Sequence, residues 1–285
     1  MWQVKWFRIA VIIVSGLAAV GLAFIIINIF ERSFSESPAP ISNSNLTPLP
    51  SLQGQLPEPK TLGVATKDTS NTAILMYHHI QDVPKLANST EKNLSLSPAK
   101  FKEEIKYLSD VGYKTATMAE LFNDVPEQRV VLTFDDGYKD VITNAFPTLK
   151  EYGFRGVAFI IIDDVGKPGY MTWDDLKNLK NQGWEIGSHS LTHPDLEVSS
   201  KDVAQKQIVD SKRILEDKLG IKIEFFCYPA GKYNPTTISI LKAAGYIGAV
   251  TIDSGSENLK SRIFELKRLR IFNSESLASF KLKVK

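Results

Sequence analysis

The sequence predicts an α/β fold in which a parallel sheet, closed or nearly closed into a barrel, is surrounded by helices. Short runs rich in β-branched and aromatic residues alternate with stretches of helical length from Thr72 onward. Most of the strand runs are predominantly apolar, which is typical of parallel strands buried on both faces. Because seven or eight such units follow one another, a β/α barrel is favoured, and an open doubly wound sheet is the alternative.

Each predicted strand is an apolar run bounded by turn-forming or charged residues. The predicted strands are Ala73–Tyr77, Arg129–Phe134, Gly156–Ile162, Trp184–Gly187, Ile223–Tyr228, Ile247–Ile252 and Leu266–Ile271, with Tyr113–Thr115 as a further short strand.

The predicted helices are recognised by their capping residues. Pro98–Val111 follows Ser97 as N-cap and stops at Gly112, and Thr117–Glu120 carries a capping-box signature. Each of the others runs up to a glycine, and they are Tyr138–Tyr152, Thr172–Gln182, a long helix from about Ser199 to Gly220, and Pro235–Ala244.

An apolar stretch near the start of the chain predicts a membrane anchor. Ile9–Phe30 is long enough to cross a bilayer as one helix, and Lys5 and Arg8 before it predict a cytoplasmic N-terminus. A cleaved signal peptide is the alternative, but its apolar region is usually shorter. We therefore expect residues 1–32 to be a cytoplasmic stub and a single-pass anchor in the cell membrane, with the catalytic domain on the extracytoplasmic side.

The next segment, residues 33–70, is rich in Ser, Pro, Asn and Thr and shows no apolar period. Such a composition cannot bury enough surface to offset the entropy of ordering, so it predicts a disordered spacer. Residues 71–285 then form the catalytic domain.

Charge and cysteine content exclude two classes of function. The formal net charge is only +2, from 34 basic and 32 acidic residues, and no basic run stands out, so we expect no nucleic acid partner. A neutral, hydroxyl-rich substrate fits this balance better. The single cysteine, Cys227, lies in an apolar run and is expected to be a buried strand thiol rather than a nucleophile.

Polar residues follow several predicted strands, where barrel enzymes carry their active groups. Asp135 and Asp136 directly follow one strand, and two adjacent carboxylates resist joint desolvation unless a cation is present. One of them can then bind the ion while the other acts as a base. An ordinary capping turn explains Asp-Asp-Gly equally well when it is taken alone.

His189 and His193 follow another predicted strand and are four residues apart, a spacing that lets both reach one ion. One carboxylate with two imidazoles suits Zn²⁺, the expected metal, and is also used by Co²⁺, Ni²⁺ or Fe²⁺. An iron oxygenase is a remote alternative, because Asp135 would then have no task.

Thr133–Gly137 together with His189–His193 resembles the polysaccharide deacetylase family, the NodB-homology group of carbohydrate esterase family 4. The resemblance extends over roughly Ala73 to Ile271. It implies a distorted (β/α)7 barrel and the metal-dependent removal of acetyl groups from N-acetylated sugars. It also implies that Asp135 is the general base and that the metal ligands are Asp136, His189 and His193.

The sequence departs from the common family pattern in two places. Cys227 stands where many members have an arginine that steadies the base, and Arg268 or Arg270 is a candidate replacement. The late histidine that supplies the general acid is missing, and His78, near the start of the domain, resembles the acid of the poly-N-acetylglucosamine deacetylases. His79 is expected to point the opposite way and to serve packing or a hydrogen bond.

The resemblance also implies that the Ala230 N–H helps to hold the oxyanion. Candidate substrate-binding residues are Tyr228, Pro229, Tyr233 and Trp173, whereas core packing is expected for Trp184.

The favoured substrate is a poly-β-1,6-linked N-acetylglucosamine polymer outside the cell. Peptidoglycan and O-acetylated carbohydrates are the alternatives for an enzyme, and an inactive carbohydrate-binding barrel is the alternative without chemistry.

Overall fold

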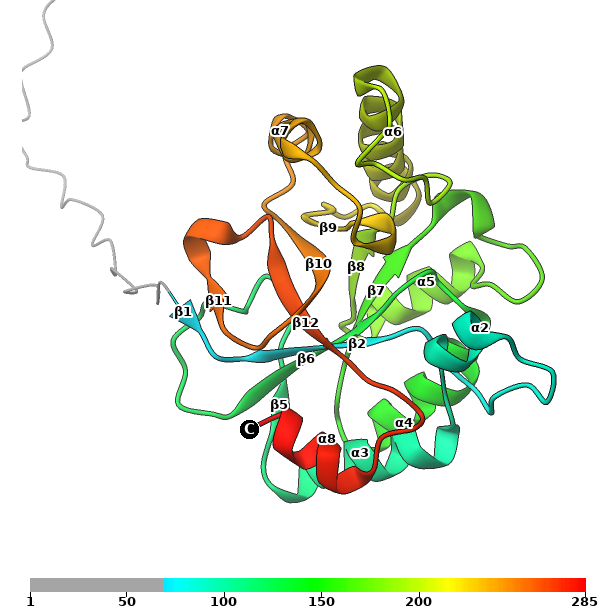
Figure 1. Ribbon diagram of the computed structural model, residues 1–285, viewed down its shortest axis with the longest axis vertical. Helices are drawn as coiled ribbons and strands as arrows, with labels where there is room; N and C mark the ends of the chain where they lie inside the picture. The colour runs from blue at the N-terminus through cyan, green and yellow to red at the C-terminus, as the bar shows by residue number, and fades with distance from the viewer. Residues whose placement is uncertain (1–68) are drawn as a thin grey trace, which may run out of the picture. The chain divides into compact units, whose positions relative to one another are not determined.

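The computed structural model describes residues 69–285 (Figure 1). The predicted membrane anchor and almost all of the predicted spacer lie outside the described residues. Among the helices of the described part, none combines the length and the apolar character needed to cross a membrane.

Seven parallel strands form a closed barrel, so the open sheet considered as the alternative is wrong. In spatial order they are β2 (Ala73–Tyr77), β12 (Leu266–Arg270), β10 (Gly248–Ser254), β9 (Phe225–Cys227), β8 (Glu185–Ser188), β7 (Val157–Ile160) and β6 (Arg129–Phe134). Closure comes from β2, the first barrel strand along the described part of the chain, which pairs with β12 on one side and with β6 on the other.

The barrel is distorted. β8 and β9 are joined by one residue pair, Ser188 with Phe226, and the register shifts between β10 and β12. The first two residues of β6 also pair with the short strand β5 (Lys114–Thr115), while its last two pair with β7.

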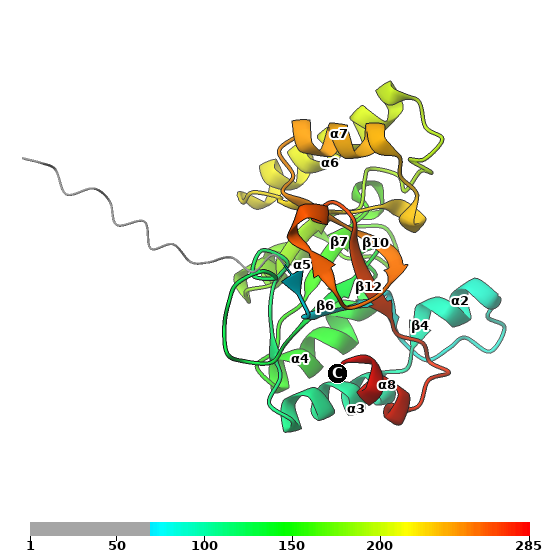
Figure 2. The ribbon, with the colours of Figure 1, turned by 60° about the vertical axis from the view of Figure 1, so that its left-hand side comes forward.

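Seven α-helices are assigned within residues 69–285, and they lie outside the barrel. They are α2 (Ser89–Leu94), α3 (Pro98–Asp110), α4 (Phe146–Glu151), α5 (Trp173–Asn181), α6 (Lys201–Leu219), α7 (Pro235–Ala243) and α8 (Leu277–Lys283). In both ribbon views α3, α4 and α8 lie on one side of the barrel, and α6 and α7 lie together on another (Figures 1 and 2).

Two predicted helices differ in detail. The helix predicted over Tyr138–Tyr152 consists of a π-helical turn, Val141–Ala145, followed by α4. Pro147 lacks the N–H that a regular α-helix would require there, which explains the widened turn. At Thr117 the Glu120 side chain accepts the backbone N–H as a capping box requires, but only turns follow.

Four short strands flank the barrel. β1 (Thr69–Ser70) pairs antiparallel with β11 (Asn258–Leu259), and β3 (His79–Ile80) pairs with β4 (Ser95–Leu96).

Alternate residues of each strand belong to two separate apolar layers, as the period of a β-strand requires. Residues packed inside the barrel include Ile74, Val131, Phe159, Phe225, Cys227, Val250 and Leu266. Residues between the barrel and its helices include Leu75, Tyr77, Leu132, Phe134, Ile160, Phe226 and Tyr228. This alternation decides which polar side chains reach the barrel interior at the ends of the strands.

Candidate active site

A cluster of two imidazoles and one carboxylate lies beyond the carboxyl ends of β6 and β8. The Asp136 Oδ1 atom is 3.3 Å from His189 Nε2 and 3.9 Å from His193 Nε2. Ligand atoms from all three residues lie within 4.8 Å of one another. The structure therefore brings together the three residues expected to hold the metal.

The backbone of this cluster is unusual. Four non-glycine residues among residues 69–285 have positive φ angles, and they are Asp136, Ser190, His193 and Ala230, with φ of 70°, 70°, 58° and 50°. Side chains other than glycine adopt this region at a cost, and such residues concentrate at functional sites. All four lie in the two predicted motifs or in the segment after β9.

The His189 ring is held in the orientation that a metal ligand needs. Its Nδ1 donates a hydrogen bond of 2.7 Å to the Cys227 carbonyl oxygen. Because a carbonyl can only accept, Nδ1 carries a proton, and Nε2, which faces Asp136, is the nitrogen available to a metal. Two imidazole nitrogens and one carboxylate oxygen fit a divalent transition metal such as Zn²⁺.

A second group of candidate ligands, Asp135, His189 and Cys227, suits a metal less well. Both Asp135 oxygens are already engaged by Arg268, and burial raises the pKa of the Cys227 thiol, which keeps it protonated. The group containing Asp136 is therefore the better candidate.

Arg268 fixes Asp135. Its Nη1 and Nη2 atoms each donate a hydrogen bond of 2.8 Å to one oxygen of that carboxylate, and the Arg268 side chain is fully buried. Although burial alone would raise the pKa of Asp135, the Arg268 guanidinium holds it well below its usual range. Of the two arginines considered, Arg268 therefore makes the contact with Asp135.

The pair is supported by its neighbours. Arg268 also donates to Thr133 Oγ1 and to the Thr251 carbonyl, and its Nη2 lies 3.3 Å from Cys227 Sγ. The thiol that stands in place of the family's arginine thus lies against the arginine supplied by β12.

The two adjacent histidines after β2 face different surroundings, as the strand period predicts. His78 Nε2 lies 3.8 Å from Asp135 Oδ2. Burial lowers the pKa of His78 to about 4, and the nearby Asp135 and Asp136 offset this only in part. His79 turns away, with Nδ1 2.5 Å from Asp140 Oδ2 and its ring stacked on Tyr138, so its expected packing role is confirmed.

Of the predicted substrate-binding residues, three are committed to packing. Tyr228 is fully buried, stacks on Tyr233 and donates to the Phe264 carbonyl, and Pro229 is also buried. Trp173 packs against the outer apolar layer beneath the Lys218 ammonium group. Trp184 is a core residue, as expected.

Tyr233 is partly buried and its hydroxyl donates to Glu265.

The sequence reasoning missed an aromatic pair beside the cluster. The rings of Tyr138 and Tyr170 lie 5.1 Å apart, and both residues are half-buried. The nearby Asp136 carboxylate adds to the effect of burial in raising the pKa of each tyrosine. Tyr138 directly follows the Asp135–Gly137 motif, so its nearness to the cluster could have been predicted from the sequence. No local feature of the sequence predicts that Tyr170 lies next to Tyr138.

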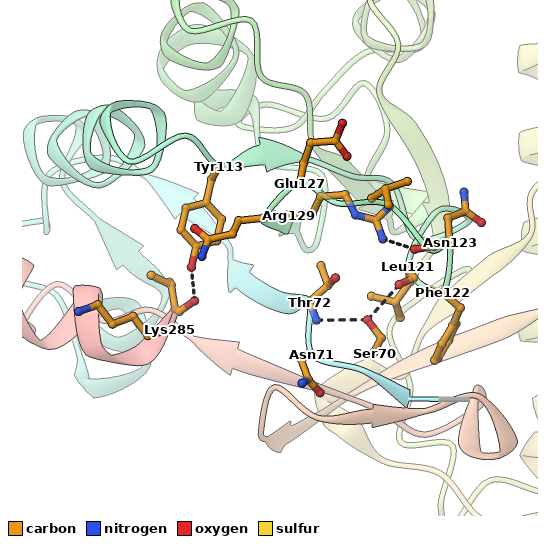
Figure 3. Close-up of a pocket in the computed structure, with 13 residues that line it drawn as sticks. Ser70, Asn71, Thr72, Tyr113, Leu121, Phe122, Asn123, Glu127, Arg129 and Lys285 are labelled. Carbon is orange, nitrogen blue, oxygen red and sulfur yellow. Dashed lines mark hydrogen bonds between the residues drawn. The ribbon is translucent and has the colours of Figure 1, made fainter. Parts of the chain in front are cut away.

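A cavity of about 240 Å³ lies at the opposite end of the strands. Thr72 and Arg129, which line it, stand at the amino ends of β2 and β6 (Figure 3). The Ser70 hydroxyl and the Arg129 guanidinium donate there to backbone carbonyls of the loop Leu121–Asn123. This cavity contains none of the predicted site residues.

Comparisons with known proteins agree with the fold and the site motifs. The sequence profile named polysaccharide deacetylase matches residues 122–249. YxkH of Bacillus subtilis is 29% identical over 250 residues, covering 82% of this chain and 87% of YxkH. The poly-beta-1,6-N-acetyl-D-glucosamine N-deacetylase of Staphylococcus aureus is 25% identical over 233 residues, covering 72% of this chain and 80% of that protein.

Among solved structures, the deacetylase PplD of Streptococcus pyogenes, determined in complex with acetate, has a TM-score of 0.68 and 29% sequence identity. The match covers 75% of this chain and 98% of PplD.

A closed β/α barrel with a polar cluster at the carboxyl ends of its strands has the arrangement of a barrel enzyme. The family profile, the two relatives and the PplD structure together support a polysaccharide deacetylase, an enzyme that removes acetyl groups from a polysaccharide.

Proposed function

We propose that this protein is a metal-dependent hydrolase that removes N-acetyl groups from an extracellular polysaccharide containing N-acetylglucosamine. The observation that carries the proposal is the convergence of Asp136, His189 and His193 within 4.8 Å. A second carboxylate, Asp135, lies beside this group and is held by Arg268. A ligand set and a separate base are the parts that hydrolysis of an acetamide needs.

The roles follow from the chemistry of each residue. Asp136, His189 and His193 hold one divalent ion, Zn²⁺ being the best match, with Co²⁺, Ni²⁺ or Fe²⁺ as alternatives. When bound, such an ion lowers the pKa of a water molecule and polarises the acetyl carbonyl. Asp135 accepts the proton of the attacking water, and Arg268 keeps its carboxylate oriented and charged.

The remaining steps involve the oxyanion and the leaving group. The Ala230 N–H, at the strained turn after β9, stabilises the negative oxygen of the tetrahedral intermediate. His78 delivers a proton to the departing amine of the sugar. Because burial keeps His78 neutral in the free protein, this proton reaches it only during turnover.

The favoured substrate is poly-β-1,6-linked N-acetylglucosamine. Two observations support this choice: the histidine proposed as the acid lies after the first barrel strand, and the Staphylococcus aureus relative bears the name of an enzyme for that polymer. The apolar stretch Ile9–Phe30 supports a membrane-anchored enzyme whose domain acts outside the cell. Peptidoglycan and O-acetylated carbohydrates are the other substrates to be tested.

The test is acetate release by the purified protein from poly-β-1,6-N-acetylglucosamine, chitin oligomers, peptidoglycan and acetylated xylan. We expect release from the 1,6-linked polymer, loss of activity with a chelator, and recovery with Zn²⁺ or Co²⁺. Asp135→Asn should abolish release, whereas Asp174→Asn, which removes an exposed carboxylate paired with Lys177, should not.

Three results would contradict the proposal. Activity that survives complete removal of divalent ions would exclude the metal role. Release from peptidoglycan alone would reverse the substrate preference, and release from none of the four would leave the inactive carbohydrate-binding barrel as the better hypothesis.

A further inference from the structure

Arg270, at the end of β12, has a guanidinium group with no ion-pair or hydrogen-bond partner in the described part of the chain. Within residues 69–285 the side chain takes part in no ion pair or hydrogen bond, whereas the Arg270 backbone carbonyl accepts from Lys283. The residue is nevertheless half-buried. Removing a charge partly from water without supplying an acceptor costs free energy, so an unpaired guanidinium in such a place suggests an absent ligand.

The direction of this side chain follows from the strand. Arg268 points into the barrel, where it contacts Asp135, and a residue two positions further on the same strand faces the same way. Arg270 is therefore directed to the barrel mouth, one layer above the Arg268–Asp135 pair. In agreement, its charge acts on His78, Asp135 and Asp136.

The pairing of β12 with β2 places Arg270 on the side of the site where His78 lies. It pairs in register with Met76 of β2, and His78 follows two residues later on the same face of that chain segment. Arg270 is thus adjacent to the proposed acid, whereas the turn that carries Ala230 follows β9, which is separated from β12 by β10.

This position corresponds to one part of the substrate. If His78 protonates the leaving amine, the sugar ring that bears the amine must lie on the His78 side, and the acetyl group must lie towards the ligands and Ala230. A group beside His78 therefore meets the sugar and not the acyl oxygen. A planar guanidinium offers several N–H donors in a fixed fork, which suits neighbouring hydroxyl oxygens on a pyranose ring.

We propose that the Arg270 guanidinium binds hydroxyl oxygens of the amino sugar whose acetamide is cleaved, and so selects for a sugar substrate. The inference rests on the proposed function, because it uses the role of His78 to orient the substrate. It assigns Arg270 a task different from that of Arg268, although both lie on β12 and both face the barrel interior.

The experiment compares Arg270→Met with the wild-type protein and with Lys267→Met. The control removes a cation from the opposite face of the same strand and keeps an unbranched side chain. Acetate release is measured as a function of the concentration of N-acetylglucosamine oligomers. Binding of the deacetylated oligomer is measured by calorimetry.

We expect Arg270→Met to raise KM and the dissociation constant of the oligomer by about tenfold or more, the loss expected for a hydrogen bond from a charged donor. The kcat should change by less than about threefold, because the contact with the sugar hydroxyls is the same in the bound substrate and in the transition state. Lys267→Met should leave all three quantities unchanged. Arg270→Lys should bind with intermediate affinity, since it keeps the charge but loses the fork, and it replaces the methionine variant if that one fails to fold.

Three outcomes would overturn the inference. Unchanged KM and unchanged oligomer binding would show that Arg270 does not touch the sugar. A loss confined to kcat would show that it acts through His78. A KM effect seen solely with oligomers that carry carboxylate groups would show that its ligand is an anion. If the wild-type protein binds oligomers but releases no acetate, the proposed function fails while the binding measurements still test Arg270.

Discussion

The buried pair of Arg268 and Asp135 gives the sharpest prediction. Both side chains are almost inaccessible, with side-chain exposures of 0% and 3%, and two hydrogen bonds of 2.8 Å join them. Arg268→Met fills similar space with an apolar group but leaves the Asp135 carboxylate without its compensating charge. Breaking a buried pair by removing one partner typically costs about 3–5 kcal/mol.

The measurement is urea unfolding of the metal-free protein at neutral pH, so that an ion cannot offset the missing charge. We expect Arg268→Met to lower the free energy of unfolding by about 3–5 kcal/mol. The double variant Arg268→Met with Asp135→Asn should recover much of this loss, because no isolated charge then remains buried.

The pH dependence of the loss has a definite sign. In the wild-type protein Arg268 depresses the pKa of Asp135, so the pair contributes stability above the unfolded-state pKa, and this contribution is lost as the pH falls. In Arg268→Met the Asp135 carboxyl group takes up a proton as the pH falls and is then no longer an unpaired buried charge. The difference in unfolding free energy between the wild-type protein and Arg268→Met should therefore shrink on acidification. A loss below about 1 kcal/mol at neutral pH, or a double variant as unstable as the single one, would refute the reasoning.

Three further outcomes are expected. Asp136→Asn, measured by equilibrium dialysis with Zn²⁺ or Co²⁺, should weaken binding more than about 100-fold, whereas His79→Gln should not, and equal losses would contradict the assigned site. Glu104→Gln should flatten the pH dependence of unfolding. Burial raises the pKa of Glu104 to about 8. The contribution of Glu104 to the free energy of unfolding is therefore complete below the unfolded-state pKa and is lost as the pH rises through about 8, by about 2–4 kcal/mol. A wild-type plot of unfolding free energy against pH without this decline would contradict the assignment. Gly187→Ala should lower stability by about 1–3 kcal/mol in thermal melting, because the new Cβ would lie 2.5 Å from the Phe159 ring, and Phe159→Leu should relieve the strain if that contact is the cause.

The strands could be predicted more closely than the helices. Ala73–Tyr77 and Arg129–Phe134 have the predicted bounds because each is largely apolar and is followed directly by charged or polar residues. α2 escaped prediction because it has no buried residue and hence no apolar period, although Asn88 and Glu91 form a capping box. The π-helical turn before α4 depends on Pro147, and the apolar period of the segment gives no sign of the widened turn.

The two motifs identified the residues of the candidate cluster, but not the neighbouring residues that contact and orient them. Asp136 and His189 could be recognised from local sequence, since each stands in a short characteristic pattern. The partner of Asp135 could not be chosen between Arg268 and Arg270, because both occupy the same face of β12 and strand period alone does not give the height of a residue in the barrel. Tyr170 comes close to Tyr138 through the tertiary fold, for which the sequence offers no local signal.

The closure of the barrel by its first strand has a consequence for how the molecule is made. β2 acquires its second neighbour only when β12, near the end of the chain, has been synthesised and has docked. Until then β2 exposes an unpaired edge, and contacts between such distant segments form slowly, which leaves the incomplete chain open to aggregation. The docking of β12 also brings Arg268 to Asp135. A chain that ends before β12 would therefore lack both the last barrel strand and the arginine that holds the Asp135 carboxylate.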